Sequence, residues 1–418
     1  MSAGPEHPPF PVRLVVTDDL QRSRLTVFFR WLLAIPHFLW IALLGSAVAV
    51  VVFVNWFIVL FRARTPQGFH DFITGFLRYA THVESYILLA ANPFPAFYPM
   101  TDSTYHYPVD LEFDPPARQN RWKTFFRLFL AIPAMTIGTT LLWGGPRSGG
   151  YYAGGLAFGV AFLLWWVGMI KARAPRGLRD LLSYCVGYSA QLWAYLFLVT
   201  DRYPYTGPNA YVQPTLPAEG EPAPEPHAVG LSVDDDLRRS RVLVFFRLPI
   251  VIPHLIWWFG WTMLAALTEL LTWLSALVIG RPPRPFHRFL SAYLRYTTHL
   301  NAFFLLVANP FPGFVGKPGS YPVELQLPEE PQQQKRLVIF FRLLLALPAL
   351  LVSGSVSGAM WTASFFGWFV ALVRGEMPDG IRNLGGYSLR YGGQVNAYVF
   401  LLTGRYPDSG PRPDPTSP

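Results

Sequence analysis

Hydrophobic positions gather into four long apolar runs, and each run opens with nearly the same phrase. The phrase is FFRWLLAIPH from Phe28, FFRLFLAIPA from Phe125, FFRLPIVIPH from Phe245 and FFRLLLALPA from Phe340. In each copy a proline stands six residues after the arginine. A phrase repeated at the start of every run indicates internal duplication, which has to be recognised before local structure is predicted.

The same order of patterns recurs in each quarter of the chain. An alternating stretch comes first, and its period of two predicts a short strand. The apolar run follows, and a segment with apolar residues at spacings of three and four closes the quarter, which predicts an amphipathic helix. The alternating stretches begin at Val12, Val109, Val229 and Val323. Quarters one and three end in NPFP and quarters two and four in RYP, so the order is A-B-A′-B′.

The duplication predicts two membrane units joined by a linker. The first unit covers residues 11–205, with repeats at 11–100 and 105–205, and the second covers residues 228–408, with repeats at 228–316 and 320–408. Residues 206–227 are rich in proline and glutamate, a composition that favours an exposed linker without a packed core. We expect the two ends of the chain, residues 1–10 and 409–418, to be disordered.

Each apolar run is longer than one membrane helix requires. Between Arg30 and Arg62 lie 31 uncharged residues, whereas about 20 apolar residues span a bilayer. The second run carries an insertion around Gly144 to Gly150, which a hairpin tip would tolerate and a single membrane helix would not. We therefore predict that each run forms a membrane helical hairpin after a short interfacial helix. The alternative is one long tilted helix, with the closing segment as the returning helix.

Arginines and lysines flank every run on both sides. Under the positive-inside rule, this pattern predicts a multi-pass protein of the cell membrane with cytoplasmic N- and C-termini. The N-terminus shows no pattern of a cleavable signal. The arginine at the start of each run is expected to reach the lipid headgroups as an interfacial anchor. These predicted anchors are Arg30, Arg127, Arg247 and Arg342.

Composition supports a membrane protein. Of the 418 residues, 52 % are hydrophobic and 14 % are charged, against about 25 % charged in a soluble chain. The net charge of +9 comes with arginines at the edges of apolar runs, so we interpret it as attraction to anionic lipid headgroups and not to nucleic acid. The single cysteine, Cys185, excludes a disulfide framework and a cysteine-based metal site.

The expected fold is mainly α and polytopic. It consists of four repeats, each with a short strand, an interfacial helix, a membrane helical hairpin and an amphipathic helix. The four strands cannot stay unpaired beside the membrane. They are expected to form a small cytoplasmic β-structure, either with one another or with a second subunit.

The polar face of the closing helices supplies the candidate site. Its members are Arg78, His82, Arg295, His299 and Arg390. In one interpretation this face is a packing surface, and in the other its arginines and histidines converge on an anionic ligand such as a lipid headgroup. Asn55 and Glu269 stand inside apolar runs, where a polar residue is a functional candidate by default. The chain has no phosphate loop, no HExxH and no GxSxG motif, so we predict no catalytic residue, no metal, no cofactor and no enzyme activity.

Several phrases in fixed order carry a resemblance to a known family. They are FFRxLLAIP, then RxPxG after the run, then LRY, and finally NAYxFLLTGRYP, which is complete at Asn396 to Pro407 and partial at Ala194 to Pro204. They resemble the bacterial membrane family called domain of unknown function 4389. The resemblance implies an integral membrane protein and supplies no reaction, substrate or catalytic residue. Quarters one and three depart from it, with NPFP in place of RYP.

The function we expect is that of a non-enzymatic membrane scaffold or binding protein. Its partners would be membrane lipids with anionic headgroups, a second copy of the chain, or another membrane protein, and not nucleic acid. The alternative is a small-solute transporter or channel with a site on the pseudo-symmetry axis.

Overall fold

The computed structural model of the chain describes residues 10–98, 106–142, 144, 155–208 and 227–411. Most of the predicted linker, most of the predicted disordered ends and most of the glycine-rich insertion lie outside the described residues. The chain divides into two compact units, Met1–Ala223 and Pro224–Pro418. Each unit is described by itself below.

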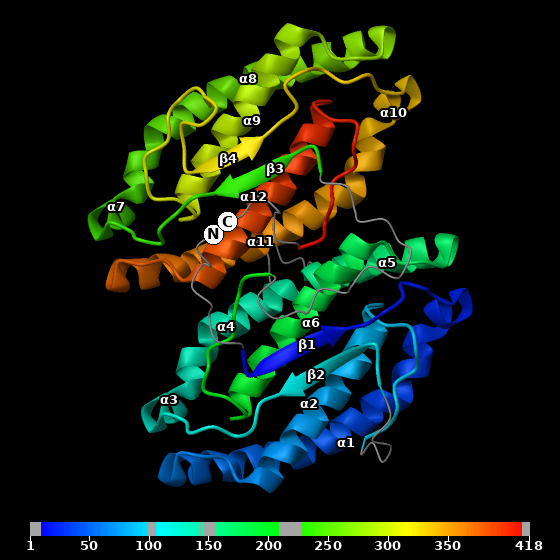
Figure 1. The fold of residues 1–418 in the computed structure, drawn as a ribbon, viewed down its shortest axis with the longest axis vertical. Coiled ribbons are helices and arrows are strands. Elements are labelled where there is room, and N and C mark those ends of the chain that lie inside the picture. Colours follow the sequence, from blue (N-terminus) through cyan, green and yellow to red (C-terminus); the bar gives the residue numbers. More distant parts are fainter. Residues whose placement is uncertain (1–9, 99–105, 143, 145–154, 209–226, 412–418) are drawn as a thin grey trace, which may run out of the picture. The chain divides into compact units, whose positions relative to one another are not determined.

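Both units are built mainly from helices, with one small sheet in each (Figure 1). The first unit contains β1 (Val12–Val16), α1 (Arg24–Arg62), α2 (Gln67–Ile87), β2 (Val109–Phe113), α3 (Arg121–Phe125), α4 (Arg127–Leu141), α5 (Leu156–Lys171) and α6 (Arg176–Leu196). The second contains β3 (Gly230–Val233), α7 (Arg241–Phe245), α8 (Arg247–Ile279), α9 (Arg284–Phe304), β4 (Val323–Gln326), α10 (Arg336–Phe340), α11 (Arg342–Arg374) and α12 (Asp379–Val399). The prediction of a mainly helical fold with small β-structure is confirmed.

The strands pair with one another, which was the first of the two predicted arrangements, the other being pairing with a second subunit. β1 and β2 are antiparallel with Leu14 opposite Leu111, and β3 and β4 are antiparallel with Leu231 opposite Leu325. These four leucines are buried. Since successive side chains of a strand point to opposite faces, one face of each sheet is buried and the other carries polar side chains. The buried face lies against the closing helices of the unit.

The two quarters of a unit are interlocked. β1 packs on α6 and β2 packs on α2, so each strand covers the closing helix of the other quarter. In the first unit the helices lie side by side in the order α1, α2, α6 and then α4 with α5, and the strands of the sheet run along α2 and α6 (Figure 1). The outer helices meet at their ends, where Trp165 Nε1 donates to Val27 O at 3.1 Å and Trp56 Nε1 donates to Thr124 O at 3.0 Å. A single quarter would leave these faces uncovered.

The predicted helical hairpins are wrong, and three of the four runs form single continuous helices. α1 is one continuous helix of 39 residues, and α8 and α11 are continuous helices of 33 residues each. The repeated prolines stay inside these helices. A continuous helix pairs nearly all of its backbone groups within the segment, whereas a hairpin tip has to leave several unpaired. The length of an apolar run compared with bilayer thickness alone does not distinguish a hairpin from one long helix.

The second quarter has two helices in place of one, and they also form no hairpin. Arg127 at the start of α4 donates to the carbonyl of Tyr195 near the end of α6, and α5 ends at Lys171, just before α6 begins. α4 and α5 therefore follow α6 in one direction. A Cβ added to Gly155 would lie 2.5 Å from the carbonyl carbon of Leu142, so the two helix ends adjoin. The insertion divides one long helix, because both halves keep their packing on α6.

The ordered part of the chain extends further than the sequence predicted at both ends. Tyr387 of α12 donates its hydroxyl to the carbonyl of Ser409 at 2.7 Å, so residues 409–411 are packed and not disordered. At the other end, Phe10 is 1 % exposed and lies under the guanidinium of Arg202. These contacts come from helices and turns far away in the sequence, which local composition does not reveal.

Candidate functional site

The outer helices carry a continuous apolar surface. On α1, large apolar side chains are exposed from Leu25 at 70 % to Phe61 at 72 %. Among the described residues, α1, α8 and α11 are long and apolar enough to cross a membrane, and most of each candidate span faces away from the protein. A soluble protein rarely exposes so large an apolar surface. These features indicate a membrane protein.

The four arginines predicted to anchor at headgroups are buried inside the protein. Arg30, Arg127, Arg247 and Arg342 are each no more than 2 % exposed. Arg30 donates to the carbonyls of Tyr86 and Ala91, and its guanidinium lies 4.3 Å from the centre of the Tyr86 ring. The prediction that they are lipid-facing anchors is therefore wrong.

The buried arginines instead cap the closing helices. The last carbonyls of a helix lack partners within the helix and sit at the negative end of its dipole. In the other quarters, Arg127 donates to the carbonyl of Tyr195 and Arg247 donates to that of Phe303. Arg342 lies 4.0 Å from the centre of the Tyr398 ring, at the end of α12. The repeated FFR phrase thus places one buried arginine at the end of each closing helix, and in three of the four quarters this arginine caps a helix carbonyl.

A leucine with left-handed backbone follows each closing helix and presents its carbonyl to a second cap. The four are Leu89, Leu198, Leu306 and Leu401, with φ between 63° and 66°. In quarters one and three the second cap is an arginine, since Arg22 donates to Leu89 O and Arg239 to Leu306 O. In quarters two and four it is a glutamine, since Gln119 donates to Leu198 O and Gln334 to Leu401 O.

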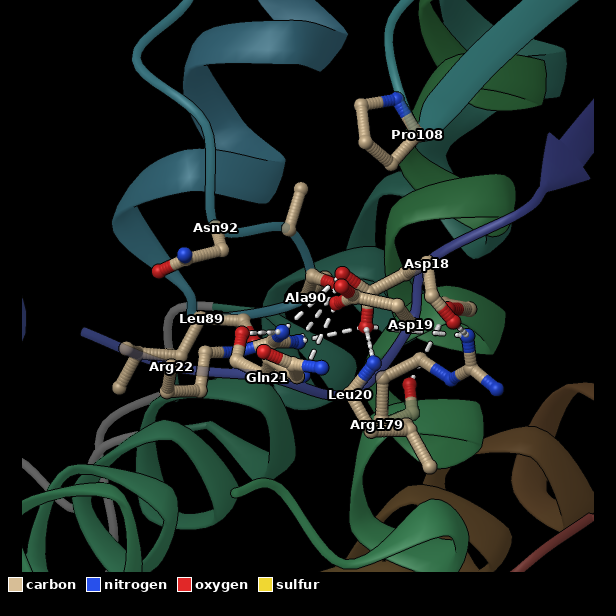
Figure 2. Close-up of polar contacts among 12 residues, drawn as sticks. Asp18, Asp19, Leu20, Gln21, Arg22, Leu89, Ala90, Asn92, Pro108 and Arg179 are labelled. Carbon is tan, nitrogen blue, oxygen red and sulfur yellow. Dashed lines mark hydrogen bonds and ion pairs between the residues drawn. The ribbon is translucent and has the colours of Figure 1, made fainter. Parts of the chain in front are cut away.

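The arginine caps need a buried counter-charge, and the turn after each A-type strand provides it. Figure 2 shows Asp18 between Arg22 and Arg179, with Arg22 also reaching the carbonyls of Leu89 and Ala90. The carboxylate of Asp18 lies 2.8 Å from Arg22, and both side chains are 1 % exposed. Removing one partner of such a pair strongly destabilises the protein, because the other charge is then buried without a partner. We interpret this cluster as structural.

The first predicted ligand pair, Arg78 and His82, already holds a carboxylate of the chain. Asp110 on β2 accepts from Arg78 Nε at 2.6 Å and contacts His82 Nε2 at 2.8 Å. Burial alone would raise the pKa of Asp110, but the hydrogen bonds from His82 and Arg78 hold that pKa well below its ordinary value. The pair therefore ties α2 to the sheet.

The second predicted pair repeats this arrangement in the second unit. Arg295 and His299 on α9 each lie 3.4 Å from a carboxylate oxygen of Glu324 on β4. Arg390 on α12 donates to the carbonyl of Gly410 and so holds the segment after the last helix. The structure brings each arginine together with its histidine within one unit. Binding of a headgroup by these residues stays a prediction.

The two polar residues inside apolar runs lie in different settings. Asn55 on α1 is fully buried and donates to Thr65 Oγ1 at 3.2 Å, and Thr65 donates to Leu198 O at 2.9 Å. Asn55 therefore supports the turn at the end of α6. Glu269 is partly exposed in the middle of α8. Among the described residues, no group of three or more His, Cys, Asp or Glu side chains could hold a metal ion.

Sequence reasoning missed the acidic partners. Both B-type strands carry an acid at the second position, as VDLEF has Asp110 and VELQL has Glu324. The A-type closing helices carry the matching arginine and histidine. This charge complementarity between an A helix and a B strand was visible in the repeat and indicates that A and B fold as one unit.

Comparison with known proteins assigns the chain to a family of unknown function. Residues 24–98, 241–315 and 336–409, more than half of the chain, match Domain of unknown function (DUF4389). The chain belongs to this family, and the resemblance seen in its motifs is confirmed. The matched segments lie in the first, third and fourth quarters. No curated protein and no solved structure matches the chain.

Proposed function

We propose that the protein is a non-enzymatic membrane scaffold or binding protein that embeds its apolar outer helices in a bilayer and engages anionic headgroups with the basic residues at their ends. The observation that carries the proposal is the exposed apolar surface of the outer helices. Exposed Arg24 and Lys171 lie at one end of the first unit, where Arg24 donates to Ile170 O, and exposed Arg62 and Lys123 lie at the other. Cations beside an apolar surface attract anionic lipids.

The units are proposed to lie along the membrane, with the outer helices in the plane of one leaflet and the sheet in water. α1 is about 58 Å long at 1.5 Å per residue, whereas the hydrocarbon core is about 30 Å thick. The sheet follows α2 and α6, and its outer face carries the Arg13–Glu112 ion pair, whose side chains are 26 % and 52 % exposed. A crossing α1 would bring this ion pair to membrane depth, where charges are costly.

The four-repeat, multi-pass arrangement with cytoplasmic termini is the alternative. Its support is the length and apolar character of α1, α8 and α11. In that arrangement residues 105–205 are the fourth copy of the family domain, in agreement with their strand, long helical segment and 21-residue closing helix. A small-solute pathway along the axis of a unit has less support, since most of α6 beneath the sheet is buried.

Lipid retention tests the headgroup proposal. Purified full-length protein is exchanged into mixed phosphatidylglycerol and phosphatidylcholine, and the retained lipids are counted by native mass spectrometry. One cation near an anionic surface contributes about 1 kcal/mol, so Arg62→Gln should lower the phosphatidylglycerol preference by up to about fivefold. Arg13→Gln, on the sheet, is the matched control and should leave the preference unchanged. Equal retention in both variants and the wild type would exclude headgroup binding by the helix ends.

A further inference from the structure

A pocket of about 370 Å³ lies in the first unit between α1, α2, α5 and α6. Its walls are aromatic and aliphatic, and they include Trp31, Phe38, Phe76, Phe158 and Trp193. The volume falls within the range of small-molecule sites, about 300–1,000 Å³. The pocket is large enough for a small organic ligand.

The pocket has a carboxyl group in its lining. Glu84 on α2 and Ser189 on α6 both line it, and the Ser189 hydroxyl hydrogen-bonds the Glu84 carboxyl. Burial raises the pKa of Glu84 to about 7. Cys185 of α6 lies near Glu84, and burial raises the pKa of its thiol far above the ordinary value. An acid in an apolar cavity is costly to ionise unless a cation pairs with it.

The position of Glu84 carries an acid in the first unit, and the equivalent position of the second unit does not. α2 and α9 both have 21 residues, and so do α6 and α12. Counting from the helix starts, Asn301 stands where Glu84 does, and Gly392 stands where Ser189 does. The carboxyl and hydroxyl are therefore not needed for the shared fold, which both units build.

The mouth of the pocket belongs to the apolar surface of the unit. Trp31, Phe158 and Trp193 are 51 %, 47 % and 45 % exposed, and they stand on α1, α5 and α6. A molecule dissolved in the bilayer therefore reaches Glu84 without crossing the polar sheet.

We propose that the pocket binds an amphiphilic organic cation, an amine or quaternary ammonium with an apolar tail. Its charged nitrogen pairs with the Glu84 carboxylate and lies against the aromatic rings, which attract cations through their faces. Its tail fills the apolar part of the cavity. An anion is excluded by the carboxylate, and a neutral ligand leaves the carboxylate unpaired. The site does not depend on headgroup binding, because the cation is held inside the unit and not at its ends.

Binding of a permanent cation tests the site. Full-length protein in non-ionic detergent is titrated with (4-phenylbutyl)trimethylammonium, and the dissociation constant is obtained from the concentration dependence of thermal unfolding. The neutral comparison is 4-phenylbutanol. Glu84→Gln should weaken binding of the cation roughly tenfold or more and leave binding of the alcohol within about twofold. Glu269→Gln removes an acid from an apolar helix of the other unit and is the matched control, with both ligands unaffected.

The pH dependence gives a second criterion. The cation carries no titrating proton, so its binding should strengthen from pH 6 to pH 8 as Glu84 ionises, and this dependence should vanish in Glu84→Gln. Cys185 on α6 stays protonated in this range, and the lining from α1 and α5 is apolar. Equal affinity for the cation in the wild type and Glu84→Gln, or preference for the alcohol in the wild type, overturns the proposal. Neither result bears on phosphatidylglycerol retention.

Discussion

Replacing Arg30 by methionine tests whether the repeated arginine caps a helix or anchors the chain to lipid. Methionine keeps the length and apolar character of the side chain but removes the guanidinium. The change removes three charge-assisted hydrogen bonds, to Tyr86 O, Ala91 O and Asn92 Oδ1, and the contact with the Tyr86 ring. Hydrogen bonds from a charged group contribute about 1.5–3 kcal/mol each, and a buried cation on a ring contributes about 1–2 kcal/mol.

Part of this loss is offset because methionine carries no charge to desolvate. We therefore expect Arg30→Met to lower the free energy of unfolding by about 2–3 kcal/mol. The assay is denaturant unfolding of the purified protein in detergent micelles. Arg62→Met, at the exposed far end of α1, is the control and should change stability by less than about 0.5 kcal/mol. If the two variants are equally stable, Arg30 is not a buried cap.

Two further predictions concern packing and pH. Gly385→Ala places a methyl group 2.3 Å from Val307 and should destabilise the protein by about 1–3 kcal/mol. Its control is Gly386→Ala, whose added methyl group lies 3.6 Å from its nearest neighbour and which should be neutral or stabilising. Equal stability of the two variants would contradict the packing of α12. Because the pKa of Asp110 is lowered in the folded protein, its contribution to stability is present above about pH 4 and is lost as the pH falls. Unfolding measured from pH 6 to pH 3 should therefore show a steeper loss for the wild type than for Asp110→Asn, and parallel curves would contradict the ion pair.

The order of the strands and helices could be predicted from the sequence because local patterns indicate each of them. The four alternating stretches and the closing helices appear where the periodicity places them, and the strands pair within each unit. The A-type and B-type quarters could be told apart by their closing phrases. These patterns predict which elements form and in which order, because local propensity and amphipathicity determine both.

The long-range polar contacts could not be predicted from local patterns. Arg30 stands at the edge of an apolar run, as a membrane anchor would, but its acceptor Tyr86 is 56 residues away. The helix end that it caps comes next to Arg30 through the packing of α2 on α1. The hairpin prediction was wrong for a related reason, since the contacts of α1 with α3 and α5 are also long-range and do not appear in the local pattern.

The depth of α1 along its length tests the proposed position in the membrane most directly. Spin labels at three exposed positions, Leu25, Leu43 and Phe61, report depth through power saturation with oxygen and a water-soluble nickel complex in reconstituted vesicles. A helix lying in one leaflet predicts similar oxygen accessibility at all three positions. A helix that crosses the bilayer predicts a shallow label at each end and a deep one in the middle. That graded profile would contradict the in-plane arrangement.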